Sequence, residues 1–264
     1  NLNGSINFNN FSADFGLKTQ DLRWVDHHLG HAASAYYTSG FDNCLIVTVD
    51  GTDGLYCASA NVAAGGAITR LTRSSDMCSP GYFYSFVTEL LGFKRNRHEG
   101  KITGLAAYAR PENAFHLFAD CIKTSPDKSG FELGFDPARH LNVTWQNSNL
   151  RLPLDTLKGL GAFSREEIAS SAQHFTEHLL CDHIRGLAKA TGMRTVALAG
   201  GVFANVRVNQ KILELPEIDQ IYVHPDMGDG GLAVGAALMV WADGLLKAKK
   251  TPMPQRLEHV YLGP

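Results

Sequence analysis

The chain has 264 residues, of which 44% are hydrophobic and 19% are charged, and its formal net charge is -2. This composition is typical of a globular protein that buries a sizeable core, as one large domain or as two smaller lobes. The near-neutral charge gives no indication of a nucleic acid or an anionic membrane surface as a partner. No apolar run approaches the roughly 20 residues that cross a bilayer, so we expect no membrane span.

Five cysteines are scattered along the chain, and none is paired in a CxxC motif. This pattern favours reduced thiols over a disulfide framework or a zinc ribbon. We therefore expect a cytoplasmic protein.

The first half of the chain begins with a predicted helix over 27–38, which Asp26 can cap. Strands are predicted over 44–49, 55–62 and 67–73. Gly65-Gly66 is typical of a hairpin turn between the last two. Further helices are predicted over 80–91, 101–109 and 112–122.

The second half begins with residues 124–163, whose many turn formers indicate an insertion or a connection. Ser164-Arg165-Glu166-Glu167 resembles a capping box with its acid one place displaced, and it opens a helix to about residue 190. Strands at 195–199 and 221–223 each run into a glycine loop. Helices follow them over 203–213 and 232–246. This alternation predicts an α/β fold with ligand-binding loops at the strand ends.

His27 and His31 are candidate metal ligands because they lie four residues apart in a predicted helix. At that spacing both imidazoles lie on one helix face and can reach one ion. Two-histidine spacings also arise by chance in helix caps and polar pockets, and that alternative stays open for the pair alone. His28 points elsewhere on the helix and is interpreted as structural. The motif lacks the glutamate of HExxH, so a zinc-protease function is not indicated.

Asp50 and Asp229 are the candidate carboxylate ligands, since each follows an apolar strand and lies among glycines. Taken alone, each is more often a turn aspartate than a ligand. Two imidazoles with two carboxylates suit iron(II), manganese or zinc.

Three glycine loops at strand ends could hold phosphate groups through backbone N–H groups. None matches a Walker or GxGxxG motif, but together they favour a nucleotide cleft. Lys101, in the run Glu99-Gly100-Lys101, is the candidate catalytic residue, predicted to lie near a phosphate or a carbonyl oxygen and to offset its charge. The same run can equally be a helix start with tightly packed small residues. The basic stretch 94–98 is interpreted as a solvated loop that could steer an anionic substrate. The predicted nucleotide- or substrate-binding residues are Gly51, Thr52, Gly54, Gly200, Gly201, Asn205, Gly228 and Gly230.

Six segments together resemble the carbamoyltransferase family that includes the nodulation-factor and tobramycin carbamoyltransferases. They are DHHLGHAASAYYTSGF (26–41), VTVDGTDG (47–54), HEGKITGLAAYA (98–109), LAGGVFANVRVN (198–209), HPDMGDGGLAVGAAL (224–238) and HVYLGP (259–264). The resemblance implies an α/β fold of the actin-like, sugar-kinase-like class with two ribonuclease-H-like lobes. Residues 1–110 would be the remainder of a first lobe that is incomplete at its N-terminus, 111–163 a connection and 164–264 the second lobe.

The resemblance also implies a chemistry. The iron ligands of the family fall on His27, His31, Asp50 and Asp229, and Asn205 lies beside the nucleotide. The family makes carbamoyl-adenylate from carbamoyl phosphate and ATP, and then transfers the carbamoyl group to an acceptor hydroxyl. Adenylate formation, with its magnesium, belongs to a C-terminal synthase-like domain that follows the segment matched here. Small-molecule substrates, that further domain and a homodimer are therefore the expected partners, with no nucleic acid and no membrane.

Two alternative functions are kept. An ATP-dependent small-molecule kinase of the same fold would use magnesium and oxygen ligands and would not need the histidine pair. A regulatory or tRNA-threonylcarbamoylation-type subunit would bind nucleotide without carbamoyl transfer.

Overall fold

The computed structural model describes residues 23–136 and 154–261, and its centre is one mixed five-stranded sheet in the order β3-β2-β1-β6-β7. Strand β1 pairs antiparallel with β2 and parallel with β6, and β6 pairs parallel with β7. The carboxyl ends of β1, β6 and β7 therefore lie at one edge of the sheet. The strands are β1 (Cys44–Val49), β2 (Tyr56–Ala64), β3 (Ala67–Ser75), β6 (Thr195–Ala199) and β7 (Gln220–Val223).

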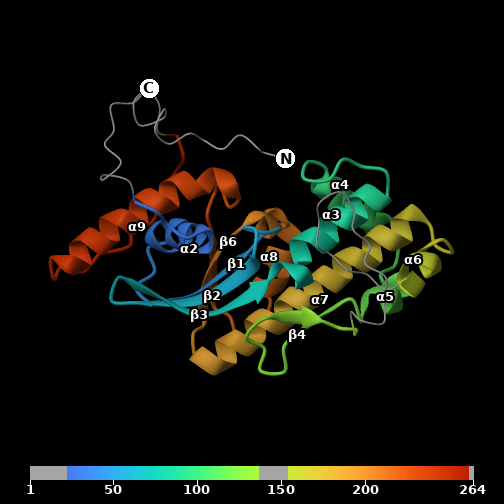
Figure 1. Cartoon of the computed structure of the whole chain (residues 1–264), viewed down its shortest axis with the longest axis horizontal. Helices are drawn as coiled ribbons and strands as arrows, with labels where there is room; N and C mark the ends of the chain where they lie inside the picture. The colour runs from blue at the N-terminus through green and yellow to red at the C-terminus, as the bar shows by residue number, and fades with distance from the viewer. Residues whose placement is uncertain (1–22, 137–153, 262–264) are drawn as a thin grey trace.

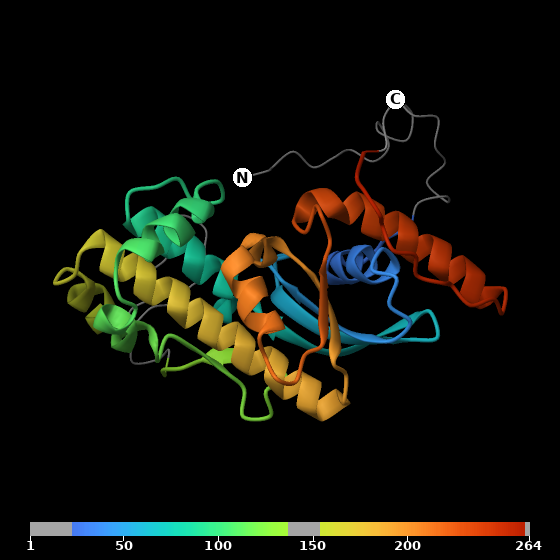
Figure 2. The same cartoon turned by 180° about the vertical axis from the view of Figure 1, so that it is seen from behind.

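Helices cover both faces of this sheet (Figures 1 and 2). On one face lie α2 (His27–Tyr37) and α9 (Leu232–Lys247), and on the other lie α7 (Arg165–Thr191) and α8 (Val206–Leu213). The side chains of β1 alternate between two cores. Ile46 packs with the α2 side, whereas Leu45 and Val47 pack with the α7 side.

The other helices gather around the amino-terminal part of α7, away from the sheet (Figure 1). They are α3 (Pro80–Leu90), α4 (Glu99–Leu105), α5 (Glu112–Phe118) and α6 (Leu154–Leu160). A small hairpin joins β4 (Ile122–Thr124) to β5 (Phe131–Leu133). Short 3-10 turns complete the chain as η2 (Asp76–Cys78), η3 (Ala106–Tyr108), η5 (Gly201–Ala204) and η6 (Asp229–Gly231).

Helices α2 and α9 cross with their backbones in contact. A Cβ atom on Gly235 would overlap the carbonyl oxygen of Gly30, and a Cβ on Gly30 would lie 3.0 Å from Leu232 Cδ2. At position 235 only glycine allows such a close approach, because the atoms it would meet are backbone atoms of Gly30. The crossing places the start of α2 beside the turn that precedes α9.

The sheet corrects the predicted division of the chain. Strands at 44–75 and 195–223 were expected in different lobes, but they form one sheet because β1 pairs with β6. Residues 1–110 and 164–264 are therefore not separate lobes in the part of the chain that the structure describes. The segment between β3 and β6 adds the helical layer instead. Residues 1–22, 137–153 and 262–264, which belong to the predicted ranges and to the final motif, lie outside the described residues.

Local predictions agree more closely with the structure. The Gly65-Gly66 turn is confirmed, with φ of 57° and 79°. The capping box at Ser164 is confirmed, but the prediction that its acid is displaced by one position was wrong. The Ser164 side chain accepts from Glu167 N–H, and the Glu167 carboxylate accepts from Ser164 N–H. The predicted helix over 112–122 ends earlier, at Phe118, and the segment 124–163 contains β5 and α6.

One stretch contradicts the expectation that no segment could cross a membrane by length and composition. Residues Asp229–Lys247 form 19 residues of mean hydropathy 1.3. In the structure most of this stretch is helix α9, which packs on α2. It is the only such helix among the described residues, and one helix of this kind is weak evidence for a membrane protein.

Candidate metal centre

Helix α2 presents two histidines on one face. The helix starts where the Asp26 carboxylate accepts from the Leu29 N–H group, 2.9 Å away. His27 and His31 then lie one turn apart with ring centroids separated by 4.8 Å. His31 is fully buried, and the side chain of His27 is 21% exposed. The four-residue spacing therefore brings both imidazoles to one place, as predicted.

Two carboxylates come from the carboxyl edge of the sheet. Asp50 directly follows β1, and Asp229 begins the 3-10 turn before α9. The Asp50 backbone N–H donates to Cys57 O at 2.8 Å, so β2 holds the residue in place. Asp229 is far more exposed, with 73% of its side chain accessible.

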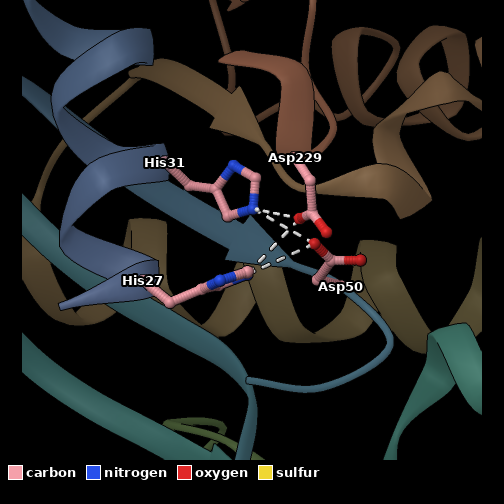
Figure 3. Close-up of side chains that lie close together, drawn as sticks. All are labelled: His27, His31, Asp50 and Asp229. Atoms are coloured by element: carbon pink, nitrogen blue, oxygen red, sulfur yellow. Dashed lines mark hydrogen bonds and ion pairs between the residues drawn. The ribbon is translucent and has the colours of Figure 1, made fainter. Parts of the chain in front are cut away.

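The four side chains converge on one point, as Figure 3 shows. His31 Nε2 lies 3.1 Å from Asp50 Oδ2 and 3.6 Å from Asp229 Oδ1. His27 Nε2 lies 3.6 Å from the same two oxygens. All four ligand atoms lie within 4.8 Å of one another, which is close enough for a single ion to contact them all.

The electrostatics of this cluster favour a cation. Burial opposes ionisation of Asp50, but the neighbouring His27 and His31 rings outweigh it and hold the pKa of Asp50 well below its usual range. The Asp50 carboxylate, 3.6 Å away, raises the pKa of His27. Burial, together with the nearby charge of Asp50, raises the pKa of Asp229. Two carboxylates this close repel each other, and a shared cation would remove that repulsion.

The hydrogen bonding of the four side chains also fits a bound metal ion. His27 Nε2 is buried and has no hydrogen-bond partner among the described residues. An imidazole nitrogen left without a partner in a buried site costs free energy unless it binds an ion or water. Nitrogen and oxygen donors together suit iron(II), manganese or zinc.

His28 has a different role, as expected. Its ring is completely buried, and Nδ1 lies 2.8 Å from Thr48 Oγ1. Burial lowers the pKa of His28, so the ring is held neutral. It connects α2 to the sheet and does not join the cluster.

A cleft of about 680 Å³ opens beside the cluster. It is lined by Asp50 and Asp229 of the cluster and by residues of α3, α4 and the loop between them. Of the predicted nucleotide- or substrate-binding residues, five line it: Gly51, Thr52, Gly201, Asn205 and Gly228. The Asn205 side chain also caps α8 and pairs with Gln173 at 2.8 Å.

Four other predicted residues lie elsewhere. Gly54, Gly200 and Gly230 do not line the cleft, and backbone geometry explains Gly200, whose φ is 99° and whose Cβ would overlap Val49 O. Lys101 is exposed, and its Nζ lies 5.6 Å from the centroid of the Phe93 ring. The structure does not bring Lys101 to the cleft lining, so we give it no catalytic role.

The loop at Asp50 is tied to helix α3. Ser79 Oγ donates to Gly51 O at 2.7 Å and accepts from Tyr82 N–H at 3.0 Å. A Cβ on Gly81 would overlap the Asp50 backbone, with its carbonyl oxygen 2.6 Å away. Tyr82 is thereby placed in the cleft lining.

The sequence analysis missed the cleft residues that come from α3 and the loop that follows it. Tyr82, Ser85, Asn96 and Arg97 all line the cleft, but their types and spacing form no motif. The basic stretch 94–98 was the one available signal. A second cavity of about 880 Å³, between α7 and α8, contains none of the residues predicted to bind a ligand.

Comparison with known families identifies the chain. The model of the carbamoyltransferase N-terminus matches residues 12–238, which is most of the sequence. The chain belongs to the carbamoyltransferase family. The nodulation protein NolO of Bradyrhizobium diazoefficiens is 32% identical over 244 residues, covering 91% of this chain and 42% of NolO. The nodulation protein NolNO of Sinorhizobium fredii is 31% identical over 255 residues, covering 95% of this chain and 35% of NolNO.

The family members thus extend well beyond this segment, since the chain spans about two fifths of their length. Among solved structures, full-length HypF in its phosphate- and nucleotide-bound form gives a TM-score of 0.52 at 17% identity. That match covers 84% of this chain and 44% of HypF. The similarity supports the fold alone and confirms the predicted α/β, actin-like class.

Proposed function

We propose that this chain is the transfer part of an O-carbamoyltransferase, which moves a carbamoyl group from carbamoyl-adenylate to the hydroxyl group of a sugar or natural product. The observation that carries the proposal is the convergence of His27, His31, Asp50 and Asp229 at one end of the cleft. Family membership supplies the reaction type. Iron(II) is our first choice for the ion, with zinc and manganese as alternatives.

A metal ion held by these four residues would act as a Lewis acid toward a carbonyl or phosphate oxygen. The residues around the cluster would orient the substrate. His27 and Asp50 would hold the ion beside the carbonyl end of the substrate. The backbone around Gly51, Gly201 and Gly228 lines the cleft without side-chain bulk, so a phosphate group can approach closely.

The transfer is a substitution at the carbamoyl carbon. The acceptor hydroxyl oxygen forms a bond to that carbon, and the bond from the carbon to the phosphate oxygen breaks. AMP leaves with the bonding electron pair, and the hydroxyl proton passes to the departing phosphate. No covalent intermediate on the protein is required. Magnesium and ATP take part in the preceding adenylation, which we assign to a further, synthase-like domain of the full-length protein.

The test compares His31→Ala with wild type in the full-length protein. We expect loss of bound metal and at least a 100-fold lower rate of transfer from pre-formed carbamoyl-adenylate. His116→Ala, an exposed histidine on α5, is the matched control and should change neither quantity. Full retention of metal and transfer by His31→Ala would refute the proposal. Nucleotide binding without any transfer in wild type would favour a regulatory subunit.

A further inference from the structure

The cleft contains an imbalance of charge that the metal cluster does not explain. Among its described lining residues, four side chains carry formal charge: Asp50, Asp229, Glu99 and Arg97. Arg97 is the single cation of this set. Asp50 and Asp229 lie together in the metal cluster, so Arg97 and Glu99 mark a separate region of the cleft.

The loop that carries Arg97 is held in a defined shape. Asn96 has a left-handed backbone conformation, with φ of 58°, which asparagine adopts more readily than most non-glycine residues. The Asn96 N–H group donates to Glu99 Oε1 at 2.5 Å, and Ser85 Oγ donates to the same oxygen at 2.9 Å. The Glu99 carboxylate is therefore already hydrogen-bonded to protein groups, and its bond with Ser85 attaches the loop to α3.

The other two cationic side chains of this stretch, Arg95 and Lys94, do not line the cleft. The Arg95 guanidinium lies 5.9 Å from the centroid of the Tyr82 ring and 3.9 Å from Glu89. Lys94 is exposed and is not part of the cleft lining. Arg97, in contrast, lines the cleft and has no hydrogen bond or ion pair with any other residue in the described ranges 23–136 and 154–261.

From these contacts we infer that Arg97, on the loop between α3 and α4, binds the phosphate of the nucleotide moiety. The inference rests on the proposed function and deepens it. A guanidinium presents paired N–H donors that match two phosphate oxygens, and it stays charged at all relevant pH values. The carbamoyl end of the ligand then faces the His27 and Asp50 end of the cleft. Arg97 thereby positions the scissile bond without taking part in proton transfer.

The experiment measures binding of AMP and of adenosine to the full-length protein by isothermal titration calorimetry. We expect Arg97→Gln to weaken AMP binding about 10- to 100-fold, the range for loss of a charge-assisted hydrogen bond. Adenosine, which lacks the phosphate, should bind wild type and Arg97→Gln equally. Arg97→Lys keeps the charge but not the paired donors and should give an intermediate loss for AMP.

Lys94→Gln is the matched control, because it removes the same charge from the same loop outside the cleft and should leave AMP affinity within twofold. Arg97 is exposed, so the variants should keep the wild-type melting temperature, which is measured in parallel. Unchanged AMP binding by Arg97→Gln would overturn the inference, as would an equal loss for adenosine. A loss for carbamoyl phosphate with AMP unaffected would overturn the nucleotide assignment. Failure of wild type to bind AMP and adenosine at all would instead refute the nucleotide part of the proposed function.

Discussion

Three histidines lie within five residues of α2, yet the structure gives them different environments. His27 and His31 face Asp50 and Asp229, whereas His28 is buried against Thr48. Helix geometry separates the adjacent His27 and His28, because residues three or four apart share a face and adjacent residues do not. His28 is also three residues from His31, and its contact with Thr48 is what keeps its ring out of the cluster. Residue type would not separate the three.

The difference predicts opposite effects for two alanine variants. His27→Ala should abolish metal binding, because it removes one of four ligands. It should lower the free energy of unfolding of the metal-free protein by less than about 1 kcal/mol, since its side chain is partly exposed. His28→Ala should retain the metal and lose about 2 kcal/mol, because it removes a fully buried ring and its hydrogen bond to Thr48.

Metal content and urea unfolding of the chelated protein measure the two effects. Metal loss in His28→Ala with the fold intact would contradict the assignment of roles.

At the scale of elements, the distance between α2 and α9 decides whether the cluster can form. His27 and His31 lie on either side of Gly30, and Asp229 lies just before α9. Because the two helices touch at Gly30 and Gly235, the crossing sets how far the histidines lie from Asp229. The glycines thus have a role in the site although neither contacts a ligand atom.

Gly235→Ala should push the helices apart and lower metal affinity by about tenfold or more, without replacing a ligand. Gly244→Ala is the control on the same helix, because a Cβ there meets nothing within 4 Å. It should leave metal affinity unchanged and stabilise the helix by about 0.5–1 kcal/mol. Metal titration and thermal melts of both variants provide the comparison. Equal metal affinities would show that α9 does not fix the position of Asp229.

Helix α7 contains a buried histidine with a predictable response to acid. Burial lowers the pKa of His183 to about 4, although its Nδ1 donates to Lys128 O at 2.9 Å. In the unfolded chain the His183 ring binds a proton near pH 6.5, whereas in the folded protein it stays neutral until the pH is much lower. His183 therefore contributes no penalty above pH 6.5, and stability is lost as the pH falls from 6.5 toward 4, by up to about 3 kcal/mol.

His183→Gln should make the free energy of unfolding less steep over this pH window, because glutamine does not titrate. His116→Gln, which changes an exposed histidine, should keep the wild-type slope. Urea unfolding at several pH values between 4 and 7 tests this. Identical slopes for His183→Gln and wild type would show that His183 is protonated without unfolding.

At the scale of the whole molecule, a bound ion should stabilise the fold, because its ligands come from α2, β1 and the turn before α9. Binding to the folded state alone adds about 2.7 kcal/mol when the ion is present at 100 times its Kd. For a chain of this size that corresponds to a rise in Tm of about 5–10 °C. Chelation should lower the Tm of wild type by this amount and leave His27→Ala unaffected. An equal effect of chelator on both proteins would locate the ion elsewhere.

Local signals in the sequence predicted most elements, and nonlocal pairing explains what they missed. The spacing of His27 and His31 and the strand-end positions of Asp50 and Asp229 are local, and the structure brings these four residues together. The pairing of β1 with β6 joins segments about 150 residues apart, and no periodicity encodes it, so the division into lobes was wrong. The position of Arg97 likewise depends on a folded loop, which the basic stretch alone did not reveal.

The hydrogen bonds of Ser79 help to connect the Asp50 loop with the loop that carries Arg97. They fasten the Asp50 loop to the first turn of α3, and Ser85 on the same helix fastens the loop that presents Arg97. An ion at the four-residue cluster and a phosphate at Arg97 would therefore both act on segments that are tied to α3. Cooperativity should follow, and thermodynamic reciprocity requires that the factor by which the ion tightens AMP binding equals the factor by which AMP tightens retention of the ion.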